Sequence, residues 1–377
     1  MSRILIVGGY GAFGAHAAER LARTSGLDIV VAGRSPQAAA AFCERLSGSA
    51  AATLSHAQLD ATSATPEDIG RIGARVLINA SGPFQAQGYA LARACIDAGC
   101  HYVDLADARS FVTGIGTLDA AAKAAGVVVI SGASSVPGLS SAVVRDHEHA
   151  FAELREIEIG ISPGNSFDPG LATTASILAQ VGKSYKLRKG GRETTAFGWQ
   201  GLRRHRFPDI GVRLMCDVDV PDIALLPQHY PGLRTARFAA GLEVAPFHLG
   251  LWALSWLVRS GIVSTLTPLA GPLMRAKRML GFLGSDTGGM FVTMRGTGSD
   301  GTDHELRWTL IARSGHGPYV PAIASVILAK RLAGDHGLAA GAGPCFGHFS
   351  TGDFSAETAD LEIECALARA AGLNTIT

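Results

Sequence analysis

The stretch that decides the fold is Ile4-Leu5-Ile6-Val7-Gly8-Gly9-Tyr10-Gly11-Ala12-Phe13-Gly14, followed at once by an apolar helical pattern over residues 15–24. A short buried strand, a GxGxxG turn and a helix open a doubly wound α/β domain. Gly9 permits the tight turn, Gly11 lets backbone approach a pyrophosphate, and Gly14 lets helix and strand pack closely. The helix N-terminus offers N–H groups to phosphates. We therefore expect a dinucleotide to bind at Gly9, Tyr10, Gly11, Ala12, Phe13 and Gly14.

The first 145 residues continue this alternation of short apolar runs and helical stretches, which is typical of a parallel sheet covered on both faces. The expected strands are 4–7, 28–32, 52–59, 76–79, 102–104 and 127–130. The expected helices between them include 15–24, 36–46, 89–98 and 118–125. Six strands with right-handed crossovers make a doubly wound domain over residues 1–145.

From residue 146 the pattern changes to that of an α+β domain with a mixed or antiparallel sheet, extending to residue 318. Residues 157–161 alternate with the strand period, and residues 171–181 favour a helix. Residues 289–298 and 304–313 favour two antiparallel strands joined by a turn-rich tip. Beyond them, 321–333 and 361–371 are predicted to be helices.

The end of the second strand indicates which dinucleotide binds. An NAD site would place Asp or Glu about 20 residues beyond the glycines, to accept a hydrogen bond from the ribose 2′-hydroxyl. That position holds Arg34, with Ser35 beside it. A cation with a neighbouring hydroxyl suits a 2′-phosphate, so NADP(H) is favoured. Asp60, after the third strand, either contacts the adenine amino group or caps a turn, and the sequence leaves both open.

The loop after the fourth strand is the second candidate cofactor segment. Ligands of such sheets bind outside the carboxyl ends of the strands. This loop should therefore face the nicotinamide half of the cofactor. Its residues are Asn79, Ala80, Ser81, Gly82, Pro83 and Phe84.

These segments together resemble the saccharopine dehydrogenase-like NADP-dependent oxidoreductases over about the first 140 residues. The resembling stretches are 9–14, 32–34, 79–84, 95–105 and 132–139. Residues 284–290 and 315–321 are similar to a branch of that family distinct from the lysine-pathway enzymes. The resemblance implies a Rossmann domain, a second domain built on a mixed sheet, and a C-terminal segment, 319–377, that returns to the first. It also implies hydride transfer at a carbon–nitrogen bond, or at an activated carbon–carbon double bond in other members.

Three residues are candidates for catalysis. Asp104 follows the fifth strand and Ser134 follows the sixth, so both should lie near the nicotinamide. The alternatives are that Asp104 caps the next turn and that Ser134 only shapes its loop. Tyr319 lies in a Gly/Pro-rich loop that could close over the site.

Hydride transfer to an imine needs orientation, water exclusion and one proton donor. We expect a small or apolar substrate, reacting at C=N or CH–NH between the two domains. The alternatives are an enoyl reductase acting on a lipid-like or carrier-bound substrate, and a non-catalytic NADP(H)-sensing binding protein. A nucleophilic cysteine opening the second domain, as in semialdehyde dehydrogenases, is replaced by serine. No metal site is expected.

Composition limits the partners. The chain has 377 residues with 33 basic and 32 acidic side chains, a formal net charge of +1 that argues against nucleic-acid binding. Six cysteines without a CxxC pair favour reduced thiols in the cytoplasm. The acid-free segment 244–283 suggests buried helices, a homodimer interface or peripheral membrane contact.

Overall fold

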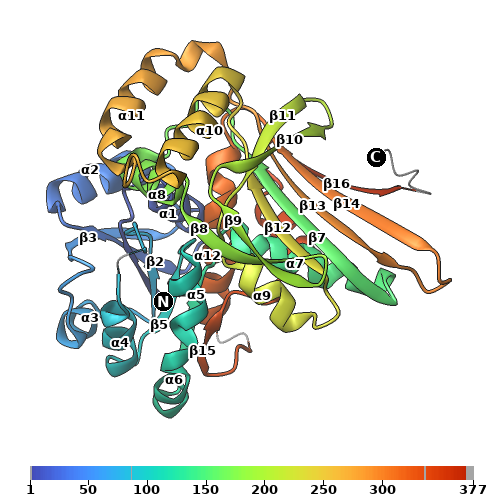
Figure 1. The fold of residues 1–377 in the computed structure, drawn as a ribbon. Helices are drawn as coiled ribbons and strands as arrows, with labels where there is room; N and C mark the ends of the chain where they lie inside the picture. The colour runs from blue at the N-terminus through green and yellow to red at the C-terminus, as the bar shows by residue number, and fades with distance from the viewer. Residues whose placement is uncertain (1, 86, 335–336, 371–377) are drawn as a thin grey trace. The chain divides into compact units, whose positions relative to one another are not determined.

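The computed structural model describes residues 2–85, 87–334 and 337–370, and the chain divides into two compact units (Figure 1). Unit 1 comprises Met1–Leu139 and Pro318–Phe349, and unit 2 comprises Ser140–Gly317 and Ser350–Thr377. The sequence expects the first boundary at 145/146 and assigns all of 319–377 to a segment returning to the first domain. In the structure only Pro318–Phe349 belongs to unit 1, and the chain rejoins unit 2 at Ser350.

Unit 1 is built on a seven-stranded sheet of order β15-β6-β5-β4-β1-β2-β3 in which every pairing is parallel. The strands are β1 (Ser2–Val7), β2 (Leu27–Gly33), β3 (Thr53–Gln58), β4 (Val76–Asn79), β5 (His101–Asp104), β6 (Val128–Ser131) and β15 (Gly341–Pro344). The six strands expected from the sequence are confirmed. The edge strand β15 escapes prediction because Gly-Ala-Gly-Pro carries no apolar alternation.

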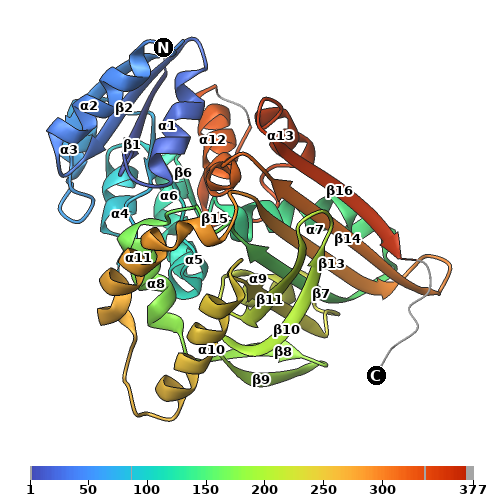
Figure 2. The same ribbon diagram turned by 90° about the horizontal axis from the view of Figure 1, so that it is seen from above.

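Helices cover this sheet on both faces. They are α1 (Gly14–Ala22), α2 (Pro36–Ser47), α3 (Pro66–Ile72), α4 (Ala90–Asp97), α5 (Arg109–Gly114), α6 (Asp119–Ala125) and α12 (Val320–Ala333). Although it comes from far along the chain, α12 packs beside α1 against β1, β4 and β5 (Figure 2). Its residues are apolar and buried nearly all round, as expected for a helix between a sheet and a neighbouring helix.

Unit 2 has a seven-stranded mixed sheet of order β10-β11-β12-β7-β13-β14-β16 and a separate hairpin, β8–β9. Its strands are β7 (Glu153–Ser162), β8 (Ser184–Lys189), β9 (Arg192–Phe197), β10 (Gln200–Phe207), β11 (Gly211–Asp217), β12 (Thr235–Ala240), β13 (Gly288–Thr297), β14 (Asp303–Ala312) and β16 (Ile363–Ala370). Only β12 and β7 pair in parallel within the large sheet. The two-domain α/β fold class with a mixed second sheet is therefore confirmed.

The predicted helix at 361–371 is wrong. Residues 363–370 form strand β16, which pairs with β14 in antiparallel register from Ile363 opposite Ala312. Alanine, leucine and glutamate favour a helix locally, but the hydrogen-bonding edge of β14 outweighs that weak propensity. By contrast, the predicted hairpin at 289–298 and 304–313 is confirmed as β13–β14.

The helices of unit 2 are α7 (Ser140–His147), α8 (Gly170–Gln180), α9 (Asp222–His229), α10 (Ala245–Arg259), α11 (Ala270–Met279) and α13 (Thr351–Glu357). Within the described ranges no helix is long and apolar enough to cross a membrane. The segment 244–283 forms α10 and α11 with short 3-10 turns, and it leaves large apolar side chains exposed. These are Leu249, Trp256, Leu257, Ile262, Leu269, Leu273, Met279, Phe282 and Leu283.

Candidate functional site

The glycine turn after β1 has the geometry that a dinucleotide requires. The backbone N–H groups of Gly8 and Gly9 donate to the Ala32 carbonyl of β2 at 2.8 and 3.2 Å. A Cβ on Gly14 would collide with the Gly8 carbonyl oxygen, and one on Gly9 would lie 2.9 Å from the Ile6 carbonyl oxygen. Side chains are therefore excluded at both positions, which keeps α1 close to β1 and leaves the turn's backbone accessible.

The N-terminus of α1 is prepared for an anion. Phe13 occupies the N-cap position without a side-chain cap hydrogen bond, and the first turn has no acidic residue. The first N–H groups of a helix lack intrahelical partners, and the helix dipole adds partial positive charge. A Ser, Thr, Asp or Asn side chain at the N-cap can serve these groups. Here a phosphate fits that role.

Tyr10 connects the glycine turn to the end of β2. Its hydroxyl accepts a hydrogen bond from the Ser35 backbone N–H at 3.0 Å. Its ring lies so close to Gly33 that a Cβ there would come within 2.6 Å of the ring. The Ser35 side chain itself caps α2 by accepting from the Ala38 N–H at 3.2 Å. Arg34 is exposed between these fixed neighbours, and its contact with a 2′-phosphate stays a prediction.

Asp60 caps a turn. Its Oδ1 accepts from the backbone N–H of Thr62 at 3.0 Å and from the Thr62 hydroxyl at 2.8 Å. These hydrogen bonds, with a smaller contribution from Arg34, hold the pKa of the Asp60 carboxyl below its usual value. Of the two sequence interpretations, the turn cap is the one the structure displays. Adenine contact stays a prediction.

The loop after β4 adjoins the glycine turn. A Cβ on Gly8 would lie 3.0 Å from the carbonyl of Ala80, and the Ala80 N–H donates to the Val7 carbonyl at 2.8 Å. The side-chain oxygen of Asn79 accepts from both the N–H and the hydroxyl of Ser81, at 3.0 and 2.5 Å. The two predicted cofactor segments therefore lie side by side at the carboxyl edge of the sheet.

The rest of the β4 loop is fixed by its own contacts. Gly82 and Pro83 are joined by a cis peptide bond. The Gln87 side-chain amide donates to the Pro83 carbonyl at 2.9 Å. The Phe84 ring is buried, 5.3 Å from the ring of Phe111. Phe84 thus anchors the loop in the core of unit 1, while Gly82 and Pro83 shape it.

Asp104 lies at the centre of a buried polar network behind this edge. Its Oδ1 accepts from the N–H groups of Ala106 and Gly132 at 3.0 and 2.8 Å, and from the Ser131 hydroxyl at 2.9 Å. Burial raises the pKa of the carboxyl to about 6, and these hydrogen bonds limit the rise. The side chain is fully buried. Asp104 therefore ties the end of β5 to the loop after β6 and holds that loop in place.

Tyr102 is a site residue that sequence reasoning missed. Its hydroxyl accepts from the Asn79 side-chain amide at 3.0 Å, and burial raises the tyrosine pKa well above its usual value. The available signal was the strand register, because Tyr102 stands two positions before Asp104 on the same face of β5. Ser131, at the end of β6, was missed for the same reason.

Ser134 and Tyr319 occupy different places in unit 1. Ser134 is nearly buried in the loop after β6, where its carbonyl accepts from the Leu139 N–H at 3.0 Å. The Tyr319 hydroxyl donates to Glu19 of α1 at 2.8 Å, and its ring lies 4.2 Å from the ring of His16. Burial and the Glu19 carboxylate raise the pKa of Tyr319 to about 12. Tyr319 thus borders the first turns of α1, and its catalytic role stays a prediction.

The Tyr-x-x-x-Lys spacing of short-chain dehydrogenases occurs in the sequence at Tyr185 and Lys189. Both residues lie on strand β8 of unit 2. Tyr185 is buried and Lys189 is exposed. The pair therefore does not belong to the nucleotide-binding sheet.

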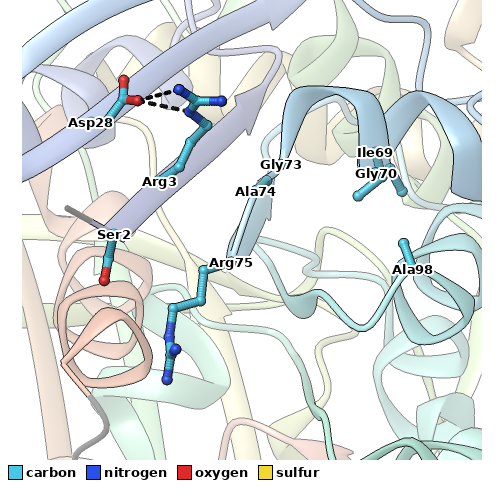
Figure 3. Close-up of a pocket in the computed structure, with 9 residues that line it drawn as sticks. All are labelled: Ser2, Arg3, Asp28, Ile69, Gly70, Gly73, Ala74, Arg75 and Ala98. Atoms are coloured by element: carbon cyan, nitrogen blue, oxygen red, sulfur yellow. Dashed lines mark hydrogen bonds and ion pairs between the residues drawn. The ribbon is translucent and has the colours of Figure 1, made fainter.

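A pocket of about 670 Å³ opens at the edge of the unit 1 sheet where the strands begin, opposite the glycine turn (Figure 3). Ser2, Arg3 and Arg75 line it where β1 and β4 begin, and Arg3 forms an ion pair with Asp28 at 2.7 Å. Ligands of doubly wound sheets bind at the carboxyl ends of the strands. This pocket is at the amino ends, so its size does not make it the cofactor site.

The glycine turn, the uncapped N-terminus of α1 and the parallel sheet define a dinucleotide-binding domain. Residues 4–130 match the family model described as the saccharopine dehydrogenase NADP binding domain. The match confirms, for this part of the chain, the resemblance drawn from the sequence, and it indicates that the cofactor is NADP(H). Among proteins with a curated description, none is significantly similar to the chain.

Comparison with solved structures gives matches at low sequence identity. Apo saccharopine dehydrogenase (L-Glu forming) from Saccharomyces cerevisiae is 14% identical with a TM-score of 0.67, and the match covers 98% of this chain and all of that one. An amine dehydrogenase from Mycobacterium smegmatis is 12% identical with a TM-score of 0.45, over 91% of this chain and 94% of that one. The yeast enzyme shows that both units have the fold of a two-domain dehydrogenase.

Proposed function

We propose that the protein is an NADP(H)-dependent oxidoreductase that transfers hydride at a C=N or CH–NH bond of a small or apolar substrate. The observation that carries the proposal is the uncapped, acid-free N-terminus of α1 behind a glycine turn, with Arg34 where an NAD site would have an acid. The choice of a carbon–nitrogen bond is supported by the fold shared with saccharopine dehydrogenase.

The bound cofactor supplies the hydride, and the residues of this chain orient it. Contact between Gly8 and Ala80 links the phosphate-binding turn to the loop that faces the nicotinamide. Asn79 fixes that loop through Ser81. Asp104 acts as a positioning residue, because it is fully buried and holds the Gly132 N–H. The hydroxyl of Ser134, two residues after Gly132 in the same loop, is the proposed source of the proton that accompanies hydride addition.

The first experiment separates cofactor binding from chemistry. The purified protein is titrated with NADPH and with NADH while nicotinamide fluorescence is followed. It is then incubated with NADPH deuterated at C4 and a panel of cyclic imines and enoyl thioesters. We expect preferential binding of NADPH and deuterium transfer to an imine carbon. Transfer only to enoyl thioesters would establish the carbon–carbon alternative, and selective binding with no transfer would favour a sensor.

The proposal includes a homodimer formed through the apolar surface of α10, α11 and the turn at 281–283. Met279 and Phe282 there, and Ile262 in the link between α10 and α11, are each more than 70% exposed, and patches of this kind are uncommon on monomers. Light scattering of the wild type and of Phe282→Asp tests this: the variant should dissociate. A wild-type monomer that floats with anionic liposomes would instead support membrane contact.

A further inference from the structure

Unit 2 contains a second pocket, of about 300 Å³, formed by hairpin β8–β9, the start of β10, the end of β11, β12 and the last turn of α10. Its charged and amide side chains are Lys189, Gln200, Asp217, Arg237 and Arg259. None of them belongs to the nucleotide-binding residues of unit 1. The volume lies at the lower end of the range for small-molecule sites.

Arg259 is a cation held in place without a counter-ion. Its guanidinium carbon lies 4.1 Å from the centre of the Phe197 ring and 4.8 Å from that of Trp256. Its Nη1 donates to the Gln200 side-chain oxygen at 2.5 Å. No described carboxylate is within ion-pair distance of it. Two aromatic contacts and one neutral hydrogen bond therefore fix a guanidinium whose remaining donors are available.

Gln200 is a buried amide with an unused donor. The residue is 6% exposed, and within the described chain its Nε2 has no hydrogen-bond partner. Buried polar atoms without a partner are rare and costly, so this one needs an explanation. Since its oxygen is bound by Arg259, the amide orientation is set, and the NH₂ group is left to donate.

The local backbone is shaped to place Gln200 there. Trp199, just before it, has a φ of 60°, which is unusual for a residue with a side chain. Gly198 and Gly201 flank the pair, and a Cβ on Gly198 would collide with the Gln180 carbonyl. The pairing of β10 with β11 shifts register between Gln200 and Arg203. Bulges of this kind redirect side chains, often beside binding sites.

The pocket has an excess of positive charge. Lys189, Arg237 and Arg259 face a single carboxylate, that of Asp217. Asp217 is already occupied, because Arg203 reaches it at 2.7 Å and Arg237 at 2.9 Å. Its charge is thus neutralised from within the protein, while Lys189 and Arg259 have no acidic partner among the described residues. An anionic ligand would complete the pocket's charge balance.

We propose that this pocket binds the carboxylate of a small organic acid through Arg259 and the Nε2 donor of Gln200. A planar guanidinium beside a fixed amide matches the planar, bidentate geometry of a carboxylate. The Asp217 carboxylate in the wall disfavours a dianion such as phosphate more than a singly charged group. Lys189, on the hairpin, serves a second acidic group of a dicarboxylate.

Isothermal titration calorimetry on the full chain without nicotinamide cofactor tests this, with glutarate, succinate and inorganic phosphate as separate probes. Arg259→Gln removes the charge. Gln200→Glu keeps the size of the side chain and its bond to Arg259 but fills the site with an internal carboxylate. Arg188→Gln is the matched control, because Arg188 lies on the same hairpin outside the pocket. Circular dichroism melts confirm that each variant folds.

We expect one dicarboxylate to bind the wild type at a single site, and both pocket variants to weaken it at least about tenfold, the loss expected for one charge-assisted hydrogen bond. Arg188→Gln should bind as the wild type does. Absence of carboxylate binding, equal binding by the pocket variants, or binding of phosphate alone would each overturn the proposal. Because no cofactor is present, none of these results bears on hydride transfer.

Discussion

The turn after β1 and the turn after β9 each help to form a binding site for an anion, but they do so by different means. Both use a glycine where a Cβ would strike a neighbouring carbonyl, Gly14 in the first and Gly198 in the second. The first turn directs backbone N–H groups and a helix end toward a phosphate. The second places the Gln200 side chain, which contacts Arg259 of α10, toward the proposed carboxylate. A backbone site has its requirements in consecutive residues, whereas a side-chain site gathers residues from distant elements.

The largest expected effect comes from adding a side chain to the backbone site. Gly14→Ala places a Cβ against the Gly8 carbonyl, and backbone on both sides prevents relaxation. We expect the strain to open the turn and to weaken NADPH binding by about 3 kcal/mol, which is about 100-fold in affinity. Fluorescence titration with NADPH measures it.

Gly48→Ala is the matched control for that variant. Gly48 has a φ of −66° and nothing within 4 Å of its added Cβ, so NADPH affinity should be unchanged. Equal affinities for Gly14→Ala and the wild type would show that the turn tolerates a side chain, and the contrast between the two sites would fail.

The two sites also differ in the buried carboxylate that lies next to each of them. Asp104 is bound only by neutral donors and its pKa is raised to about 6, whereas Asp217 is paired with two arginines. A carboxyl whose folded pKa exceeds its unfolded value of about 4 binds its proton more tightly in the folded chain. The contribution of Asp104 to the free energy of unfolding should therefore fall by roughly 2 kcal/mol as pH rises from about 4 to 6, and by about 3 kcal/mol over the full titration.

Asp104→Asn should remove that slope while keeping an acceptor for Ser131 and Gly132. Urea unfolding followed by circular dichroism between pH 4 and 7 measures it. Asp222 of unit 2, whose pKa burial raises to about 7, provides Asp222→Asn as a comparison that removes a slope at higher pH. A wild-type stability that rises between pH 4 and 6, and equally in Asp104→Asn, would contradict the assignment.

The sequence could predict the features that depend on consecutive residues, but not those that bring distant residues together. Six of the seven strands of unit 1, the GxGxxG turn and Arg34 were predictable because each depends on local period or spacing. The β16 strand was not, because its conformation depends on the free edge of β14 rather than on its own alanines. The network of Asn79, Tyr102, Asp104 and Ser131 joins strands β4, β5 and β6, so it required the sheet register. The pocket around Arg259 draws on residues from 187 to 259, with no spacing to reveal it.

The nucleotide site built from backbone groups is expected to depend on one side chain, that of Arg34, for its preference for NADPH. Arg34→Ala should weaken NADPH by about 1–3 kcal/mol, the value of a charge-assisted phosphate contact. It should leave NADH nearly unaffected, because the pyrophosphate still binds at the helix end. Parallel titrations with both nucleotides decide this, with Arg71→Ala on α3 as the control. Equal weakening of the two would contradict the 2′-phosphate assignment.

The smallest expected effect concerns the link between the turn and Arg34. Tyr10→Phe removes the acceptor of the Ser35 N–H but keeps the ring on Gly33, so Arg34 should lose some of its fixed position. We expect about 1 kcal/mol, or roughly fivefold, in NADPH affinity, which is the net worth of one hydrogen bond. Tyr89→Phe is the matched control, because its hydroxyl donates to the Phe111 carbonyl at 2.7 Å elsewhere in unit 1. If both variants weaken NADPH alike, the effect comes from general stability, and Tyr10 does not position Arg34. If only Tyr10→Phe does so, a side-chain contact refines even the site that backbone builds.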